Sequence, residues 1–406
     1  MVLKLTRSYT NSFKGLSTQV WWLALITFIN RAGTMVVPFM SLYLTEHLQF
    51  SLANVGWVMT AFGLGSVAGA WLGGKLTNKF GFYQVMFWSL LLSGFMFVAL
   101  QYITSLTHFC MAIFLLLLVA DTFRPALFVA VAAYAKPENR TRAVTLIRLA
   151  INLGFSFGPA VGGFIIHNLS YNGLFWIDGV TCVLSALLFV YVLNERKGNN
   201  KVKEEEVGEK GSPYKDKAYI VFVIALLLIG FTFLQYFSTI PLYYKDVHRL
   251  TEEEIGWLMS MNGFLIFLIE MPLVSYYERP RFSKYRILAI STLLFALSFF
   301  ILNMSSWLGV LVIGMVLMTV GEMLNFPFLN SFAMSRAAKF NNQGEYMALF
   351  TMTFSVAHIF AHNSGMQLID NFGYEITWYI MGAMLLVSIV FLILLRNMIR
   401  KEERGE

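Results

Sequence analysis

Nine ionisable side chains lie well inside stretches of sequence that are otherwise apolar. They are Arg31, Asp121, Arg124, Arg148, Asp178, Glu270, Glu322, His358 and His362. A charged Arg, Asp or Lys at the centre of a membrane costs roughly 2.5–3.5 kcal/mol on insertion scales. Such residues are retained where they face water or one another, and they usually mark a path for ions, protons or solutes. The chemistry that they predict is proton transfer and charge pairing.

Three carboxylates are the candidates for carrying a proton. Glu322 is the first choice, because a low-dielectric cavity favours the neutral form of a carboxylate, and loss of the proton can be coupled to an arriving cation. Glu270, beside Pro272, is the second. Asp121 is the third, since Arg124 lies three residues away on the predicted helix and the two can simply pair. A Glu322 that is bonded to a neighbouring helix and purely structural is the alternative to the first choice.

Arg31 lies within the apolar segment 20–46, and three roles are open for it. It can be the counter-ion of an acidic side chain, with Asp121 or Glu322 as partner. It can bind a carboxylate or phosphate of a substrate. The third alternative is a position at the rim of the membrane, reached by extension of the long side chain toward the interface.

The predicted substrate cavity combines these charges with polar and aromatic residues on the same helical faces. It contains Arg31, Arg124, Arg148, Asn152, Gln235, Asn325, Phe326, His358 and His362. The two histidines are one helical turn apart, a spacing that can hold zinc, but no carboxylate lies between them. We therefore expect a proton relay, a substrate contact or interhelical hydrogen bonding there, with no metal and no cofactor. No nucleophile with its base and no completed metal site is visible, so the sequence does not predict an enzyme.

The elements that must position these residues are membrane-spanning helices. The chain has 406 residues, of which 57% are hydrophobic and 13% charged, and its mean hydropathy is +0.64. A helical span needs about 20 apolar residues, so the sequence predicts an all-α membrane protein with twelve transmembrane helices. Their predicted ranges are 20–46, 54–77, 84–104, 107–135, 141–168, 172–194, 218–245, 254–277, 285–304, 307–335, 346–370 and 374–396.

The net charge of +7 is explained by orientation rather than by nucleic acid. With twelve spans and both termini inside, 25 of the 30 Lys and Arg fall in cytoplasmic segments, which is the positive-inside bias. We expect a multi-pass protein of the cell inner membrane with both termini cytoplasmic and with a first helix that is retained rather than cleaved. Cys110 and Cys182 lie in predicted helices, so no disulfide framework is expected.

Three short echoes predict an internal duplication. VGWVM at 55–59 recurs as IGWLM at 255–259, SLYL at 41–44 is matched by PLYY at 241–244, and LFWIDG at 174–179 is echoed by ITWYIMG at 376–382. Their order is the same in both halves. The charged run 195–217 reads as a cytoplasmic linker. We therefore predict two pseudo-symmetric six-helix bundles around a central cavity, residues 1–194 and 218–406.

Two motifs carry a resemblance to the major facilitator superfamily. GFSFGPAVGG at 154–163 matches the fifth-helix pattern G-x-x-x-G-P-x-x-G-G of its proton-coupled antiporters, and GGKLTNKFGFYQ at 73–84 resembles the loop between helices two and three. The resemblance implies gating roles for Gly74, Asn78, Lys79, Gly81, Gly154, Gly158, Pro159, Gly162 and Gly163. Asn78 stands where that loop normally has an acidic residue, and Glu278 is a possible replacement in the second half. Close helix packing is the physical reason for the glycines.

DTFRPA at 121–126 and GEMLNFP at 321–327 are similar to the fourth and tenth helices of bacterial multidrug antiporters in this superfamily. The resemblance implies that helices 1, 4, 7 and 10 line the cavity, that helices 2, 5, 8 and 11 form the interface between halves, and that Asp178 alone lies on an outer helix. It also implies a monomeric, proton-coupled antiporter that exports amphiphilic or cationic small molecules by alternating access.

The alternative is a proton-coupled symporter of a zwitterionic solute, such as a short peptide or amino acid. The charges of the first half are mainly basic, whereas the second half has Glu270 and Glu322. The segment 30–51 also resembles the first helix of proton-coupled peptide transporters, although Phe28, Ile29 and Asn30 stand where acidic residues are expected. Small-molecule substrates, protons and the lipid bilayer are the partners under either alternative.

Overall fold

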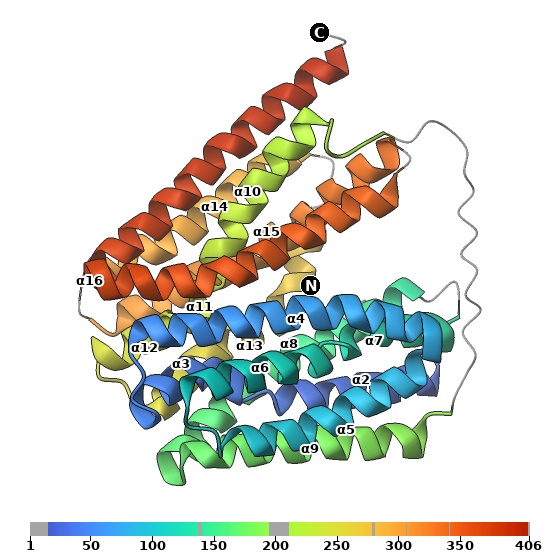
Figure 1. Ribbon diagram of the computed structural model, residues 1–406. Helices are drawn as coiled ribbons and strands as arrows, with labels where there is room; N and C mark the ends of the chain where they lie inside the picture. Colours follow the sequence, from blue (N-terminus) through green and yellow to red (C-terminus); the bar gives the residue numbers. More distant parts are fainter. Residues whose placement is uncertain are drawn as a thin grey trace, which may run out of the picture. The chain divides into compact units, whose positions relative to one another are not determined.

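The computed structural model describes residues 15–136, 140–194, 211–277, 281–305, 307–340 and 342–404, and within these ranges every regular element is a helix (Figure 1). Helices satisfy their own backbone hydrogen bonds, which an apolar membrane interior cannot do for them. Eleven of the described helices are apolar and long enough to cross a membrane, and the last one is long enough to do so twice. The predicted fold class is confirmed.

Six spans make up the first half of the chain, and two of them consist of two α-helices in succession. The elements are α2 (Thr18–Ala32), α3 (Val36–Leu42), the π-helix η1 (Tyr43–His47), α4 (Leu52–Phe80), α5 (Phe82–Leu100), α6 (Leu106–Ala120), α7 (Phe123–Tyr134), α8 (Arg140–Asn168) and α9 (Tyr171–Val192). The pair α2 and α3 with η1 forms the first span, and α6 with α7 forms the fourth.

The second half also contains six spans, and in it the fourth span is one continuous helix. Its elements are α10 (Lys217–Phe233), α11 (Gln235–Ser238), α12 (Ile240–Asp246), α13 (Glu252–Tyr277), α14 (Lys284–Phe300), the 3-10 turn η3 (Ile301–Asn303), α15 (Gly309–Lys339) and α16 (Gln343–Arg404). Gly373 interrupts α16 with φ of 75°, a conformation that glycine adopts without strain. Dividing α16 at Gly373 gives twelve spans, in agreement with the prediction.

The first, fourth and seventh spans are interrupted, which corrects the prediction of continuous helices. The first breaks at residues 33–35, the fourth at Asp121–Thr122, and the seventh at Leu234 and again at Thr239. In each of these spans the helical segment after the last break has a proline within its first three residues: Pro38, Pro125 and Pro241. The segment after the break at Leu234, α11, has the sequence QYFS and contains no proline. Proline is tolerated in a first helical turn, and it removes the hydrogen bond to the carbonyl four residues earlier.

Contacts divide the chain into two compact units. Unit 1 contains residues 1–43, 61–202 and 251–263, and unit 2 contains residues 44–60, 203–250 and 264–406. The predicted boundaries at 194 and 218 concern the duplicated bundles rather than these contacts, and they stay a prediction. Most of the predicted linker, residues 195–210, lies outside the described residues.

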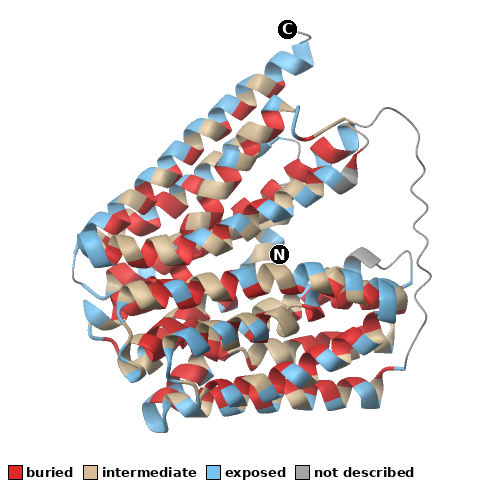
Figure 2. Ribbon diagram, in the orientation of Figure 1, coloured by how far each residue is buried: buried red, intermediate tan, exposed pale blue. Residues whose placement is uncertain are grey.

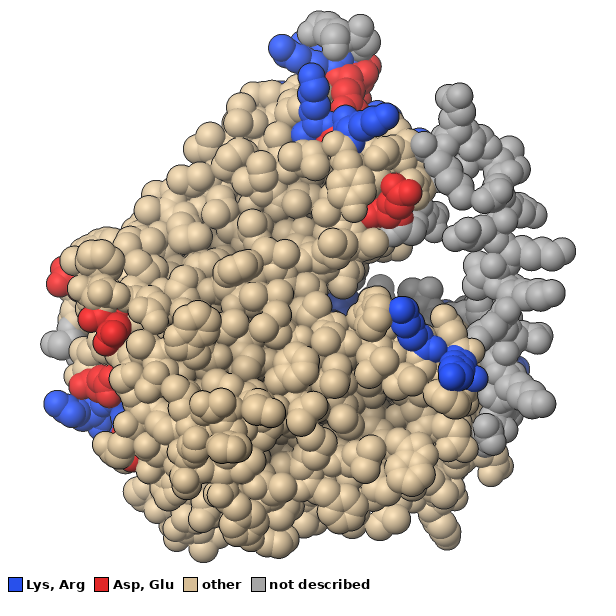
Figure 3. Space-filling view, in the orientation of Figure 1, with Lys and Arg blue, Asp and Glu red and all other residues tan. Residues whose placement is uncertain are grey.

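Within each unit the helices bury one face against a neighbour and leave another exposed. In unit 1, α5 packs on α9, and α2 packs on α8 and α9; in unit 2, α10 packs on α16, and α14 packs on α15 and α16. Figure 2 shows the buried positions as stripes along these helices. Large apolar side chains such as Trp71, Phe95 and Leu297 are exposed, and the face seen in Figure 3 is largely uncharged along the helices. Exposed apolar sides are what lipid requires.

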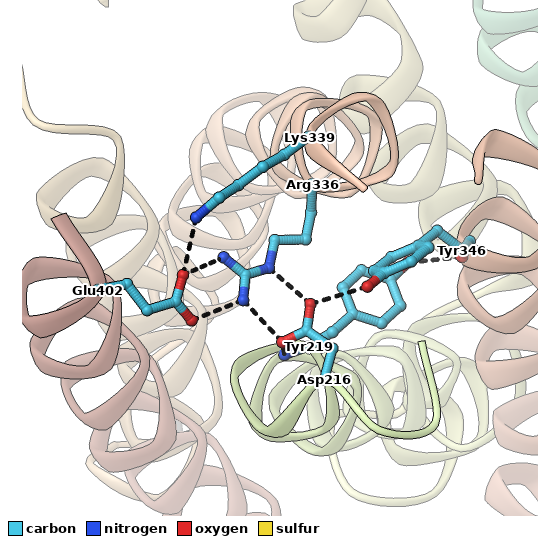
Figure 4. Close-up of polar contacts among 6 residues, drawn as sticks. All are labelled: Asp216, Tyr219, Arg336, Lys339, Tyr346 and Glu402. Atoms are coloured by element: carbon cyan, nitrogen blue, oxygen red, sulfur yellow. Dashed lines mark hydrogen bonds and ion pairs between the residues drawn. The ribbon is translucent and has the colours of Figure 1, made fainter. Parts of the chain in front are cut away.

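A buried ion cluster joins three helix ends of unit 2 (Figure 4). Arg336 of α15 donates Nε to Asp216 Oδ2 at 2.6 Å and Nη2 to Asp216 Oδ1 at 2.7 Å. Its Nη1 and Nη2 donate to the two oxygens of Glu402, both at 2.7 Å. Tyr346 donates its hydroxyl to Asp216 at 3.0 Å, and the exposed Lys339 pairs with Glu402 at 3.0 Å. Burial raises the pKa of Asp216. The hydrogen bonds that Asp216 accepts from Arg336, Tyr346 and the backbone N–H of Tyr219 outweigh the effect of burial, so the pKa lies below its usual value.

Candidate functional site

Arg31 lies in the last turn of α2, immediately before the break in the first span. It is half-buried, and its guanidinium carbon is 5.8 Å from the centre of the Phe155 ring. Asp121 and Arg124, at the break in the fourth span, are close enough to interact with it electrostatically. The structure thus brings together three of the predicted site residues, all in unit 1.

Asp121 and Arg124 do not share one helix, which corrects the single helix expected for them, although the two side chains interact electrostatically. Asp121 ends α6, whereas Arg124 lies in the first turn of α7. Ser66 of α4 donates its hydroxyl to Asp121 Oδ2. Asp121 is half-buried and Arg124 is exposed. The break therefore presents a carboxylate that is held by a neutral donor and lies in the electrostatic field of two arginines.

The glycines of residues 154–163 pack against the break in the first span. A Cβ on Gly154 would lie 2.5 Å from Arg31 Cβ and 2.9 Å from the backbone nitrogen of Ala32. A Cβ on Gly158 would lie 3.1 Å from the carbonyl oxygen of Thr34, and one on Gly162 would lie 3.2 Å from Met35 Cβ. The predicted close packing is confirmed for these three glycines, and the surface they approach is the Arg31 segment.

The end of the same motif packs against the first half of α13, also within unit 1. A Cβ on Gly163 would overlap the carbonyl oxygen of Glu252, and a Cβ on Gly256 would overlap that of Pro159. Ser156 donates its hydroxyl to the carbonyl of Ser260 at 3.1 Å. Gly256 belongs to the repeated IGWLM.

The matching glycine of VGWVM makes an equivalent approach in unit 2. A Cβ on Gly56 would lie 3.2 Å from Asn363 Cα, and Asn363 donates its amide to Thr60 Oγ1 at 3.1 Å. Both copies of the repeated pentapeptide therefore have a glycine at a close helix crossing.

The 73–84 segment contains two positions that require glycine, and one of them is Gly73, where a Cβ would lie 2.6 Å from Thr122 Cα. Gly81 has φ of 84° and precedes the first residue of α5, so any L side chain there is strained. Asn78 and Lys79 are exposed, and Lys79 Nζ lies 5.1 Å from the centre of the Phe80 ring. A Cβ on Gly74 would meet nothing within 4 Å. Glu278, the possible acidic replacement for Asn78, lies outside the described residues.

Two of the predicted cavity residues are fully enclosed in unit 2. Gln235 has no exposed surface; its amide nitrogen donates to the carbonyl of Ala361 at 2.8 Å, and its amide oxygen accepts from Thr239 at 3.1 Å. Asn325, 2% exposed, donates to the hydroxyls of Ser291 and Thr292 at 3.1 and 2.9 Å. The amide nitrogens of both residues are used in hydrogen bonds between helices.

The remaining predicted residues of unit 2 are less enclosed. Glu270, Glu322 and Phe326 are half-buried, and the Phe326 ring lies 4.8 Å from that of Phe233. The rings of His358 and His362 are 5.8 Å apart, and His362 is 2% exposed. In the described ranges no group of three or more His, Cys, Asp or Glu is arranged to hold a metal ion. Of the other predicted residues of unit 1, Arg148 is exposed and Asn152 half-buried.

Two residues at the breaks were not predicted as site residues. Ser66 is a common residue in an apolar helix, and only the fold brings it to Asp121. Asp178 was placed on an outer helix, apart from the cavity, but both of its carboxylate oxygens accept bonds at the break in the first span. Its sequence signal is that a lone Asp within the apolar segment 172–194 needs buried donors.

Comparisons with known proteins agree with this architecture. The family profile described as Major Facilitator Superfamily matches residues 23–362 and 249–406. A Na(+), Li(+), K(+)/H(+) antiporter from Planococcus maritimus is 24% identical, covering 89% of this chain and 91% of the relative. The multidrug resistance protein MdtH from Aeromonas hydrophila is 22% identical, covering 94% and 96%.

Solved structures show the same fold at low identity. A peptide transporter POT in complex with sulfate superposes with a TM-score of 0.77 at 16% identity, covering 96% of each chain. The nucleoside transporter NupG superposes with a TM-score of 0.73 at 14% identity, covering 93% of this chain and 99% of that one. The family match spans nearly the whole chain and the relatives are secondary transporters rather than enzymes, so this multi-pass membrane protein belongs to the Major Facilitator Superfamily.

Proposed function

We propose that the protein is a proton-coupled antiporter that exports amphiphilic or cationic small molecules by alternating access. The name of one relative, a cation/H(+) antiporter, supports antiport, and the name of another, a multidrug resistance protein, supports export of such compounds. The match of residues 154–163 to the antiporter motif supports the same branch. We further propose that the protein works as a monomer in the cell inner membrane with both termini cytoplasmic.

The arrangement around Asp121 carries this proposal. A carboxylate at a helix break inside a membrane span is held by Ser66 and interacts with Arg31 and Arg124. When Asp121 is ionised, it balances part of the positive charge of the two arginines. When it binds a proton, that balance is lost, and Arg31 is free to move or to meet another anion. Arg31 is thus the counter-ion of Asp121 in this proposal, which prefers that role over direct substrate binding.

Glu322 supplies the second proton-binding group, now from unit 2. It is half-buried on α15, four residues before the half-buried Phe326, and side chains four apart share a helical face. A carboxylate beside an aromatic ring suits a lipophilic cation, which gains from both charge and apolar contact. Release of a proton from Glu322 on arrival of the cation couples the two fluxes. One proton crossing 100 mV supplies about 2.3 kcal/mol, enough for a roughly fifty-fold gradient of a neutral solute.

A symporter of zwitterionic solutes is the second candidate, and charge asymmetry favours it. Arg31, Arg124 and Arg148 belong to unit 1, whereas Glu270 and Glu322 belong to unit 2. A solute with a carboxylate at one end and an amine at the other would suit such a distribution. In this case Arg31 binds the substrate.

The test uses inside-out vesicles with an acidic interior and a pH-reporting dye. We expect tetraphenylphosphonium to trigger proton efflux from vesicles with the wild-type protein, and we expect Asp121→Asn and Glu322→Gln to reduce it by about 100-fold, the effect of losing a positioned proton-transfer group. Asp370→Asn is the matched control, because Asp370 is an exposed carboxylate near the end of its helix segment. Failure of the cation to release protons, together with dipeptide movement in the same direction as protons, would replace the antiporter by the symporter.

A further inference from the structure

Asp178 of α9 is a membrane-embedded carboxylate that the proton-coupling scheme does not use. It is 1% exposed. Its Oδ1 accepts the backbone N–H of Met35 at 2.9 Å, and its Oδ2 accepts that of Val36 at 3.0 Å. These N–H groups lie where the first span resumes as α3, and the first N–H groups of a helix have no partner within the helix. Asp178 therefore supplies an acceptor to the Val36 N–H and a second acceptor to the Met35 N–H, which also donates to the carbonyl of Gly33 at 2.8 Å.

Neighbouring side chains of α9 contact the same break. Asn30 donates its amide to Cys182 Sγ at 3.4 Å. A Cβ on Gly33 would overlap the Thr181 side chain, so α9 approaches the backbone of the break closely. Residues 178, 181 and 182 are three and four apart, which places them on one face of α9. One face of α9 thus packs against the break in the first span and bonds to it.

The glycines of α8 approach the same segment. Gly154 is against Arg31 and Ala32, and Gly158 is against Thr34. The backbone segment that includes Arg31 is thus fixed by hydrogen bonds to α9 and by close packing against α8. The break that Asp178 bonds and the turn that carries Arg31 are therefore parts of one closely packed segment.

We propose that Asp178 is a positioning residue: it fixes the break in the first span and thereby holds Arg31 in its place beside Asp121 and Arg124. The role in transport rests on the proposed function, whereas the fixing of the break does not. Replacing the carboxylate by an amide removes the charge and turns one of the two acceptors into a donor. An N–H that faces a donor in place of an acceptor loses its bond and remains buried.

Cys182 reports on the break without any transport. In a Cys110→Ala background it is the only cysteine of the chain, and it is 5% exposed. We expect Asp178→Asn to raise the rate of its alkylation by N-ethylmaleimide about tenfold, as loss of one charge-assisted hydrogen bond implies. Ser185→Ala is the matched control, because Ser185 is fully buried two turns further along α9 and is not bonded to the break. Equal rates in Asp178→Asn and the control would overturn the proposal.

The second arm asks whether Asp178 acts through Arg31. Proton release by tetraphenylphosphonium is compared in Asp178→Asn, Arg31→Lys and the double variant. A positioning role requires non-additivity, with the second change adding little to the first, whereas independent effects multiply. Multiplying effects would reject positioning of Arg31 even if alkylation rises.

The Thr181→Ala variant distinguishes an altered break from a general loss of folding. Thr181→Ala keeps the carboxylate and removes only the side chain that packs against Gly33, so a smaller rise in Cys182 alkylation is expected. An unchanged rate would count against the proposal. If the wild-type protein moves no protons with the cation, the proposed function fails, while alkylation still tests the fixing of the break.

Discussion

Two buried or half-buried arginines of this protein are held in opposite ways. In unit 2, Arg336 is 5% exposed and gives four hydrogen bonds of 2.6–2.7 Å to the carboxylates of Asp216 and Glu402 (Figure 4). In unit 1, Arg31 is half-buried, contacts the Phe155 ring and interacts electrostatically with Asp121 and with a second arginine, Arg124. The guanidinium of Arg336 is bonded to two carboxylates, whereas those of Arg31 and Arg124 share one carboxylate, that of Asp121.

The difference separates an arginine with a structural role from an arginine whose surroundings change when a carboxylate binds a proton. A planar guanidinium with bidentate partners on both sides is fixed in one geometry. Two arginines around one carboxylate form a site whose charge balance changes when that carboxylate binds a proton. The Arg336 cluster therefore holds helix ends together, whereas the Arg31 site suits proton coupling. Three measurements test this contrast.

The largest effect is expected from Arg336→Ala. Removing one partner of a buried ion pair leaves an uncompensated charge and costs about 3–5 kcal/mol. We expect this loss in the free energy of unfolding of the purified protein in detergent. Lys339→Ala is the control, because Lys339 is 54% exposed and pairs with the same Glu402; such pairs contribute about 0–1 kcal/mol. Similar losses for both variants would mean that the buried bonds of Arg336 do not stabilise the packing of the helix ends.

An intermediate effect is expected from Gly154→Ala. The new Cβ would lie 2.5 Å from Arg31 Cβ, so Arg31 must shift, and overpacking of this kind costs typically about 1–3 kcal/mol. We expect proton coupling to fall more than thermal stability does, because the shift occurs at the charge site. Gly74→Ala is the control, since a Cβ there meets nothing within 4 Å. Unchanged coupling in Gly154→Ala would show that the position of Arg31 is not critical.

The smallest effect is a dependence of stability on acid pH. Burial raises the pKa of Asp216, but its bonds from Arg336 outweigh this, so the folded-state pKa lies below the ordinary 3.8. A carboxylate with a lowered pKa stabilises the fold above its unfolded pKa, and this contribution is lost as pH falls through the folded value. The melting temperature of the wild type should therefore decline below about pH 4 more steeply than that of Asp216→Asn. Parallel declines would show that Asp216 does not contribute to the stability that the ion cluster provides.

The twelve spans and most of their ends could be predicted from the sequence. Long apolar runs admit only helices in a membrane, and polar residues mark where each run stops. The chemistry of the site could be predicted in part, since Arg31, Asp121 and Arg124 stand out as charges in apolar segments. Gln235 and Asn325 stand out as polar residues in apolar segments, but their amide nitrogens bond to neighbouring helices. Whether a polar residue packs in this way or lines a site depends on neighbours that are distant in the sequence.

The breaks show where the sequence stops being sufficient. Pro38, Pro125 and Pro241 lie just after interruptions, whereas Pro159, Pro272 and Pro327 lie inside continuous helices. A proline inside a helix removes one backbone hydrogen bond, yet these three helices continue past it, so proline by itself does not select a break.

What the sequence alone determined is therefore the set of spans, their apolar faces and the charges within them, because these follow from local composition and periodicity. Which spans break and which charges meet depends on contacts between helices that are distant in the sequence. Asp178 reaches the first break from α9, and Ser66 reaches Asp121 from α4. A backbone donor or a carboxylate freed inside a membrane must find a partner, and that partner comes from another helix.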